Sequence, residues 1–202
     1  MKWWTVPAGI GGAVVLAVAA VGAITIARGD LERSMPWKFL RSASESMAPT
    51  VRSGVRLTAR RASAEELKRG DIVAFYVGDM MWIQRVVGLP GDTVEMRRGQ
   101  VVLNGKPVPQ ASVGTMEIDG ATLVVRSEQL PGLAAHRVLD QGPTNGDDTP
   151  PVRVPASKLF LLGDNRDNAM DSRFPAFAED SGGGLISFKA VYGVVRPEDI
   201  SE

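Results

Sequence analysis

Residues 71–87, DIVAFYVGDMMWIQRVV, form the stretch that decides the fold class. The segments 71–77 and 81–87 are rich in β-branched, aromatic and other apolar side chains, a composition typical of strands. Between them, Gly78-Asp79 favours a short turn. The stretch therefore predicts a β-hairpin.

More strand patterns follow on both sides of this hairpin. VRLTAR (55–60) alternates with a period of two, and Asn104-Gly105 within 100–108 is a strong hairpin signal. The capping-box pattern from Ser63 to Glu66 predicts a short helix that Gly70 ends. Further strands are expected at 121–126, 136–140, 158–165 and 185–195. Beyond its N-terminal segment, the chain is therefore expected to be mostly β with short connections.

Composition excludes several classes of function. The 23 basic and 23 acidic residues balance, so no basic excess is available to bind a nucleic-acid backbone. The chain has no cysteine, which excludes disulfides, thiolate catalysis and Cys-ligated metals. The single histidine, His136, argues against a His-based metal cluster or a Ser-His pair, and we expect it to have a packing or surface role. No metal or cofactor is implied.

The N-terminal segment has the features of a membrane anchor. Residues 8–27 carry no charge, and about 20 apolar residues are needed for a helix to cross the hydrocarbon core. Trp3 and Trp4 precede this run and suit the membrane interface. A cleaved signal peptide is the alternative, but its apolar core is shorter and ends in a small-residue cleavage site. We expect an uncleaved anchor within residues 1–30, although basic residues on both sides leave its orientation open.

Motifs with a characteristic order appear in three regions of the remaining chain. They are SASESMAPT (42–50), RGDIVAF (69–75) with QRVVGLPGD (84–92), and GDNRDNAMDSR (163–173). In order and spacing they resemble the membrane-anchored type I signal peptidases, which have S-x-S-M-x-P-T, R-G-D-I-V, K-R-V-x-G-L-P-G-D and G-D-N-R-D-N-S-x-D-S-R. The resemblance extends from about residue 38 to 195, plus the anchor.

The resemblance implies a serine nucleophile and a lysine base. Ser46 stands at the position of the nucleophile, and Ser44 at that of a serine that helps to line the oxyanion hole with the Ser46 backbone N–H. Aligned donors of this kind stabilise a tetrahedral intermediate by roughly 3–4 kcal/mol each. Met47 is expected to offer an apolar flank to the substrate.

The third motif is expected to frame the site. By the resemblance, Asp164, Arg166, Asp171 and Arg173 are supporting residues whose ion pairs pin the neighbouring turns together. A calcium site is the alternative for these carboxylates, with the set Asp164, Asn165, Asp167 and Asp171. The two arginines in the same stretch argue against calcium, because they satisfy the carboxylates.

Two positions depart from the family pattern. Gln84 stands where the family has its lysine base, and an amide oxygen is not basic near neutral pH. Arg85 is no substitute, because a guanidinium stays protonated and neighbouring strand residues point to opposite faces. Ala169 stands where the family has a serine that orients the lysine. General-base catalysis contributes roughly 10²–10⁴-fold, so turnover by the family mechanism should be strongly reduced.

Two hypotheses follow from the resemblance and these departures. The first is a signal peptidase I-like serine endopeptidase that removes signal peptides from exported precursors at the outer membrane face. The second is a catalytically silent paralogue that binds precursors or a partner peptidase, and Gln84 with Ala169 motivates it. The peptidase is the first choice because the region around Ser46 is intact.

The expected architecture is one N-terminal transmembrane helix followed by an all-β ectodomain of two antiparallel sheet regions. Residues 36–106 and 158–196 should form the catalytic core, with 107–157 as an inserted β elaboration. By the resemblance, the protein crosses the bacterial inner membrane once and its ectodomain faces the periplasm or the exterior. The apolar side chains of Trp37, Phe39 and Leu40 are candidates for contact with substrate or with the lipid bilayer.

Overall fold

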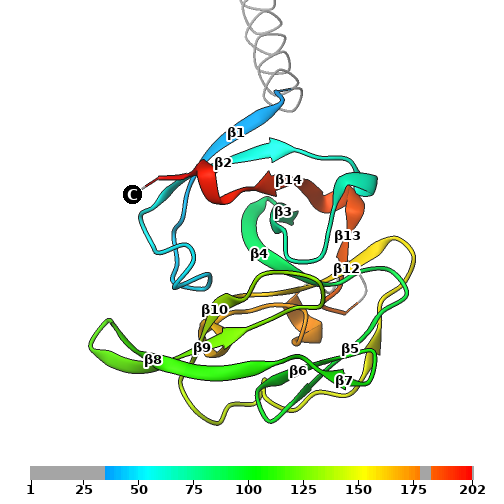
Figure 1. The fold of residues 1–202 in the computed structure, drawn as a ribbon. Coiled ribbons are helices and arrows are strands. Elements are labelled where there is room, and N and C mark those ends of the chain that lie inside the picture. Colours follow the sequence, from blue (N-terminus) through cyan, green and yellow to red (C-terminus); the bar gives the residue numbers. More distant parts are fainter. Residues whose placement is uncertain (1–34, 178–182, 202) are drawn as a thin grey trace, which may run out of the picture. The chain divides into compact units, whose positions relative to one another are not determined.

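β-Strands dominate the part of the chain that the computed structural model describes, residues 35–177 and 183–201 (Figure 1). The prediction of a mostly β fold is therefore confirmed. The expected anchor, residues 8–27, lies outside the described residues. Within the described ranges, no helix has the length and apolar character needed to span a membrane. The chain divides into two compact units, Met1–Lys38 and Phe39–Glu202.

The largest sheet contains the hairpin that the sequence predicts. β3 (Ile72–Val77) pairs with β4 (Met80–Gly88) in antiparallel register, from Ile72 opposite Arg85 to Val77 opposite Met80. Along this sheet the order is β1-β2-β14-β3-β4-β12-β13, and β15 pairs with β2. Its other strands are β1 (Trp37–Arg41), β2 (Arg56–Arg61), β12 (Lys158–Leu162), β13 (Ile186–Ser187), β14 (Val191–Val195) and β15 (Ile200–Ser201).

Two smaller sheets complete the described β structure, so there are three sheets where two sheet regions were expected. One has the order β10-β9-β8 and contains β8 (Gln110–Ile118), β9 (Ala121–Glu128) and β10 (His136–Asp140). The other has the order β11-β5-β6-β7 and contains β5 (Thr93–Arg97), β6 (Gln100–Leu103), β7 (Lys106–Pro107) and β11 (Val152–Arg153). This second small sheet joins strands from both sides of residue 107, and the division at that residue stays a prediction.

Two predicted elements differ from the structure. Residues 185–195 were expected to form one strand, but a 3-10 turn, η4 (Phe188–Ala190), separates β13 from β14. The Ser187 hydroxyl caps that turn by accepting a hydrogen bond from the Lys189 N–H at 3.3 Å. The predicted short helix is a single 3-10 turn, η1 (Ala64–Glu66), because its capping box closes over only three residues. The other 3-10 turns include η2 (Arg166–Asn168) and η5 (Pro197–Asp199).

The hairpin places apolar residues on both faces of the large sheet. Val73 and Phe75 pack in one buried cluster with Val86 and Leu161, while Ile72 and Ala74 belong to another. Side chains alternate along a strand, so β4 also presents its neighbouring residues to opposite faces. This alternation separates Gln84, opposite Val73, from Arg85, opposite Ile72.

Candidate active site

Ser46 lies in the loop between β1 and β2, next to Ser44. The two hydroxyl oxygens are 3.0 Å apart, within hydrogen-bonding distance. The Val51 N–H donates to the Met47 carbonyl at 2.9 Å, and the Ala48 N–H donates to the Glu45 carbonyl at 3.0 Å. These bonds fold the residues after Ser46 into a tight turn and fix the direction of the loop.

The third motif, residues 163–173, holds the Ser46 loop through hydrogen bonds to its backbone carbonyls. The Asn165 N–H donates to the Ser46 carbonyl at 3.0 Å, and the Asn165 side-chain amide donates to the Glu45 carbonyl at 3.1 Å. A Cβ added at Gly163 would lie 2.6 Å from the Ser46 carbonyl oxygen and 2.3 Å from the Ala169 Cβ. Glycine at position 163 therefore allows the close approach of this motif to the Ser46 loop.

The predicted oxyanion donors lie side by side. The Ser44 hydroxyl accepts a hydrogen bond from the Ser46 N–H at 3.5 Å, a length at which such a bond is weak. The Ser46 N–H therefore loses little when it donates to a substrate oxygen instead, and the Ser44 hydroxyl can rotate toward the same oxygen. Their assignment as oxyanion donors stays a prediction.

Gln84 is fully buried on β4, and Met170 engages its amide. Its Nε2 donates to the Met170 carbonyl at 2.6 Å, whereas its Oε1 has no hydrogen-bond partner among the described residues. The amide therefore makes no hydrogen bond to the Ser46 hydroxyl. Ala169, the second departure from the family pattern, precedes Met170 and is 9% exposed. Both departures thus lie on one side of the site.

Next to Gln84, a buried ion pair ties β4 to the third motif. Arg85 Nε donates to Asp164 Oδ1 at 2.8 Å, and Arg85 Nη2 donates to Asp164 Oδ2 at 2.6 Å. Thr50, four residues after Ser46, also donates to Asp164. Asp164 is thus held by residues on both sides of the site, and its neighbour Asn165 holds the Ser46 loop.

The remaining charges of the third motif form separate pairs. Asp171 pairs with Arg173 through a bond of 2.8 Å and also accepts from the Gly163 N–H at 3.1 Å. Arg166 forms its ion pair outside the third motif, with Glu128. Within the described ranges, no three His, Cys, Asp or Glu side chains gather in a way that could hold a metal ion.

Glu128, at the end of β9, is a supporting residue that the sequence did not indicate. It is fully buried and accepts hydrogen bonds from Arg166 Nη1 at 2.9 Å and Nη2 at 2.6 Å. Burial alone raises the pKa of Glu128, but the charges and hydrogen bonds of Arg166 and His136 outweigh it and lower this pKa to about 2. No motif surrounds Glu128, so only the folded chain reveals the pair.

An apolar pocket of about 320 Å³ opens beside Ser46. Ser44 and Ser46 are among its lining residues, and Leu40, Met81 and Ile83 are among the apolar residues of its wall. Arg41 is the single ionisable residue among the described residues that line it. The pocket can therefore hold an apolar segment of an extended peptide against Ser46, but its lining offers no side chain that can act as a base.

Of the residues predicted to contact substrate or membrane, some lie at the surface and one is buried in the core. Trp37 is 45% exposed and Phe39 is 78% exposed, while Leu40 lines the pocket beside Ser46. Met47 differs from its predicted place, because it is fully buried and packs with Val51 in the core. The tight turn after Ser46 directs Met47 inward, so in this structure it offers no flank to a substrate.

The comparisons with known proteins agree with the motifs. The family model described as "Signal peptidase, peptidase S26" matches residues 12–197, so the chain belongs to that family. A "Signal peptidase I" of Bacillus amyloliquefaciens is 36% identical over 158 residues, which cover 75% of this chain and 70% of that protein. "Signal peptidase I S" of Bacillus subtilis (strain 168) is 35% identical over 161 residues, covering 75% and 71% of the two chains.

Among solved structures, a signal peptidase I from Enterococcus faecalis V583 is also similar. It is 24% identical to this chain, the match covers 65% of this chain and 97% of that one, and the TM-score is 0.38. A score this low does not by itself establish a shared fold, so the family assignment rests on the sequence matches.

Proposed function

We propose that this protein is a serine endopeptidase that removes signal peptides from exported precursors, with Ser46 as the nucleophile. The Ser44–Ser46 hydroxyl pair, 3.0 Å apart at the edge of an apolar pocket, is the observation that carries the proposal. Membership of the signal peptidase family supports the choice of substrate. Small residues before the scissile bond, as in an A-x-A site, are the expected substrate feature.

Each of these groups has a proposed role in the reaction. A precursor strand bound in the pocket presents its carbonyl to Ser46 Oγ, whose attack forms a tetrahedral intermediate. Ser44 and the Ser46 N–H face the negative charge that develops on its oxygen, where aligned donors lower the barrier. Collapse of the intermediate breaks the peptide C–N bond, the serine proton passes to the departing amine of the mature chain, and water then hydrolyses the acyl-enzyme to release the signal peptide. Among the described residues that line the pocket, no side chain can act as a base for the Ser46 proton, and Gln84 is an amide bonded to Met170. We therefore expect slow turnover from the chain as it stands.

Wild-type protein should cleave a precursor with an A-x-A site, and Ser46→Ala should reduce that cleavage to the uncatalysed background. Timed gel assays with the full chain in detergent measure both rates. Ser53→Ala is the matched control, because Ser53 is an exposed serine of the same loop. Equal rates for wild type and Ser46→Ala contradict the proposal. A wild type that binds the precursor without Ser46-dependent cleavage would favour the silent paralogue.

We further propose that residues 8–27 anchor the protein through one membrane crossing, with the ectodomain on the outer face. The uncharged length of this segment supports the anchor. The curated relatives come from bacteria, which supports the bacterial plasma membrane as the location. In this arrangement residues 36–106 and 158–196 form the catalytic core, and 107–157 are an inserted elaboration.

Lipid contact should depend on the exposed aromatic residues of β1. For an ectodomain that begins at residue 35, Trp37→Ser with Phe39→Ser should weaken binding to anionic lipid vesicles by about tenfold or more, because burying one large apolar side chain contributes about 1.5–3 kcal/mol. Vesicle co-sedimentation measures this change. Val113→Ser, at a residue of β8 that is 55% exposed, should leave binding unchanged. Equal binding by the double variant contradicts lipid contact at β1.

A further inference from the structure

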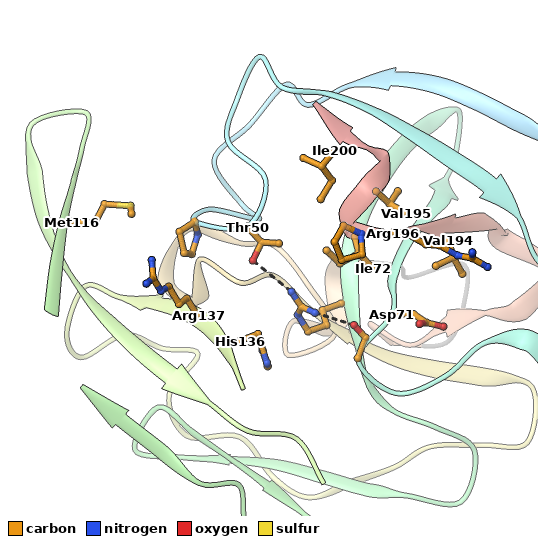
Figure 2. A pocket seen from close by; sticks show the side chains of 14 residues that line it. Thr50, Asp71, Ile72, Met116, His136, Arg137, Val194, Val195, Arg196 and Ile200 are labelled. Carbon is orange, nitrogen blue, oxygen red and sulfur yellow. Dashed lines mark hydrogen bonds between the residues drawn. The ribbon is translucent and has the colours of Figure 1, made fainter. Parts of the chain in front are cut away.

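A second cavity, of about 470 Å³, shares no lining residue with the pocket beside Ser46. Its size falls within the range of about 300–1,000 Å³ that is common for small-molecule sites. It is lined by residues of the loop between β1 and β2, of β3, β4, β8, β10 and β14, and of the segment that follows β14. Figure 2 shows Met116, His136 and Arg137 on one side, Asp71, Val194 and Arg196 on the other, and Thr50 between them.

The buried charge in the wall of this cavity is Arg85. Its side chain is 10% exposed, and its pair with Asp164 is described above. Nη1 also donates to the Gly70 carbonyl at 2.9 Å, and Nη2 contacts the Thr50 hydroxyl at 3.5 Å. These bonds use four of the five donors that a guanidinium carries. One donor on Nη1 remains for a ligand.

One of two neighbouring lining residues of β10 adds donors that the protein leaves unused. Arg137 is exposed, and its guanidinium has no hydrogen-bond or ion-pair partner among the described residues. His136 Nε2 is buried and lies 3.4 Å from Glu128 Oε1, so this nitrogen is directed at that carboxylate. Arg137 is therefore the residue of this pair that can bind a ligand.

Among the described charged residues that line the cavity, Arg137 is the cation that has no ion-pair partner. Arg85 is neutralised by Asp164, and Asp71 is the one carboxylate among the described lining residues. Arg196 lies on the same side as Asp71 and approaches Glu198 at 4.0 Å. Arg137 on the opposite side remains without a counter-charge. One free guanidinium matches one negative charge, which favours a carboxylate over a doubly charged phosphate.

The rest of the wall is apolar. Ile72 and Val195 are nearly fully buried, at 5% and 2% exposure, and Val194, Ile200 and Met116 are partly buried. Apolar walls with a few converging polar groups are the usual form of a small-molecule site. A ligand that fits both the apolar wall and the free guanidinium donors has an apolar chain and one anionic end.

We propose that this cavity binds an aliphatic carboxylate, with the carboxylate at Arg137 and Arg85 and the chain against Ile72, Val195 and Ile200. Asp164 holds Arg85, and the next residue, Asn165, holds the Ser46 carbonyl. The site is therefore separate from the substrate pocket but shares a supporting loop with Ser46.

The test uses the full chain in nonionic detergent with a trifluoromethyl-labelled hexanoate as the probe, observed by fluorine NMR. Wild type should broaden the probe signal in a saturable way, with a dissociation constant of about 1 mM, as expected for a ligand of this size. Arg137→Gln should weaken binding about tenfold, because a charge-assisted bond is lost. Arg153→Gln is the matched control, since Arg153 is an exposed arginine on β11 that does not line the cavity.

Competition with unlabelled compounds tests the two parts of the ligand. Hexanoate should displace the probe, while 1-hexanol and acetate should do so at least about tenfold less well, since each lacks one of the two features. Saturable binding that Arg137→Gln leaves unchanged would overturn the proposal, and so would the lack of any saturable binding. Stronger displacement by hexyl phosphate than by hexanoate would overturn the choice of a carboxylate.

Discussion

Gln84→Lys is expected to raise the rate of Ser46-dependent precursor cleavage by about 10²–10⁴-fold, which is the usual contribution of a general base. The site is suited to an amine, because position 84 is fully buried and the Met170 carbonyl already accepts a bond from its side chain at 2.6 Å. Burial lowers the pKa of a lysine, so part of the amine population becomes neutral and can accept the serine proton. Single-turnover cleavage of an A-x-A precursor measures the gain.

Adding Ala169→Ser should increase the rate of Gln84→Lys by a further factor of about ten, because orienting a catalytic group lowers the barrier. Ala169 precedes Met170 and lies against Gly163, next to the Ser46 carbonyl. We expect a hydroxyl at this position to reach the amine at position 84, because the next residue, Met170, already accepts a bond from the Gln84 side chain. The pH profile separates this role from a structural one, since the double variant should have a shifted alkaline rise in rate.

Two controls test whether the gain in Gln84→Lys requires an amine at position 84 and the hydroxyl of Ser46. Gln84→Met has a side chain of similar length without an amine and should stay at the wild-type rate. Ser46→Ala in the Gln84→Lys background should lose the gained activity. If Gln84→Lys and Gln84→Met cleave equally slowly while both remain folded, the family's base does not operate at position 84 in this chain.

Glu128→Gln is expected to lower the free energy of unfolding by about 3–5 kcal/mol, the usual cost of removing one partner from a buried ion pair. Both partners are inaccessible, with side-chain exposures of 0% for Glu128 and 5% for Arg166. A glutamine can still accept a hydrogen bond, but it leaves the Arg166 charge buried without compensation. Urea unfolding of the full chain, followed by tryptophan fluorescence, measures the loss.

The same pair gives stability a defined pH dependence. The pKa of Glu128 is lowered from 4.5 to about 2 in the folded protein, so its contribution is fully present above about pH 4.5 and is lost as the pH falls toward 2. Wild type should therefore lose more stability than Glu128→Gln between these values. Glu95→Gln is the control, because Glu95 forms an exposed pair with Arg97 that contributes about 0–1 kcal/mol. Parallel pH curves for wild type and Glu128→Gln contradict the prediction.

Local patterns were sufficient for much of the fold. The hairpin of β3 and β4 follows from the composition of 71–77 and 81–87 and the turn between them, and the Asn104-Gly105 turn likewise joins β6 to β7. Other elements were not predicted. β8 lacks a clear apolar alternation because most of its residues are exposed, and the break between β13 and β14 depends on a capping bond of Ser187.

The candidate site also has features that the sequence shows and others that only the structure shows. The motifs show Ser44, Ser46 and the departures at Gln84 and Ala169 directly, since those positions are read along the chain. The motifs also suggested that the charges of residues 163–173 pair among themselves. Arg173 does pair with Asp171, but Asp164 pairs with Arg85 and Arg166 pairs with Glu128.

By itself, the sequence determined the mostly β fold and the family, and it predicted that Gln84 stands at the position of the base, because these depend on residue type and local spacing. Only the tertiary structure decided that Gln84 bonds to Met170, that Met47 is buried, and that Glu128 supports the third motif. These features join residues far apart in the chain, 86 positions for Gln84 and Met170 and 38 for Arg166 and Glu128. Such contacts depend on how the strands pair and pack, and no local pattern encodes them.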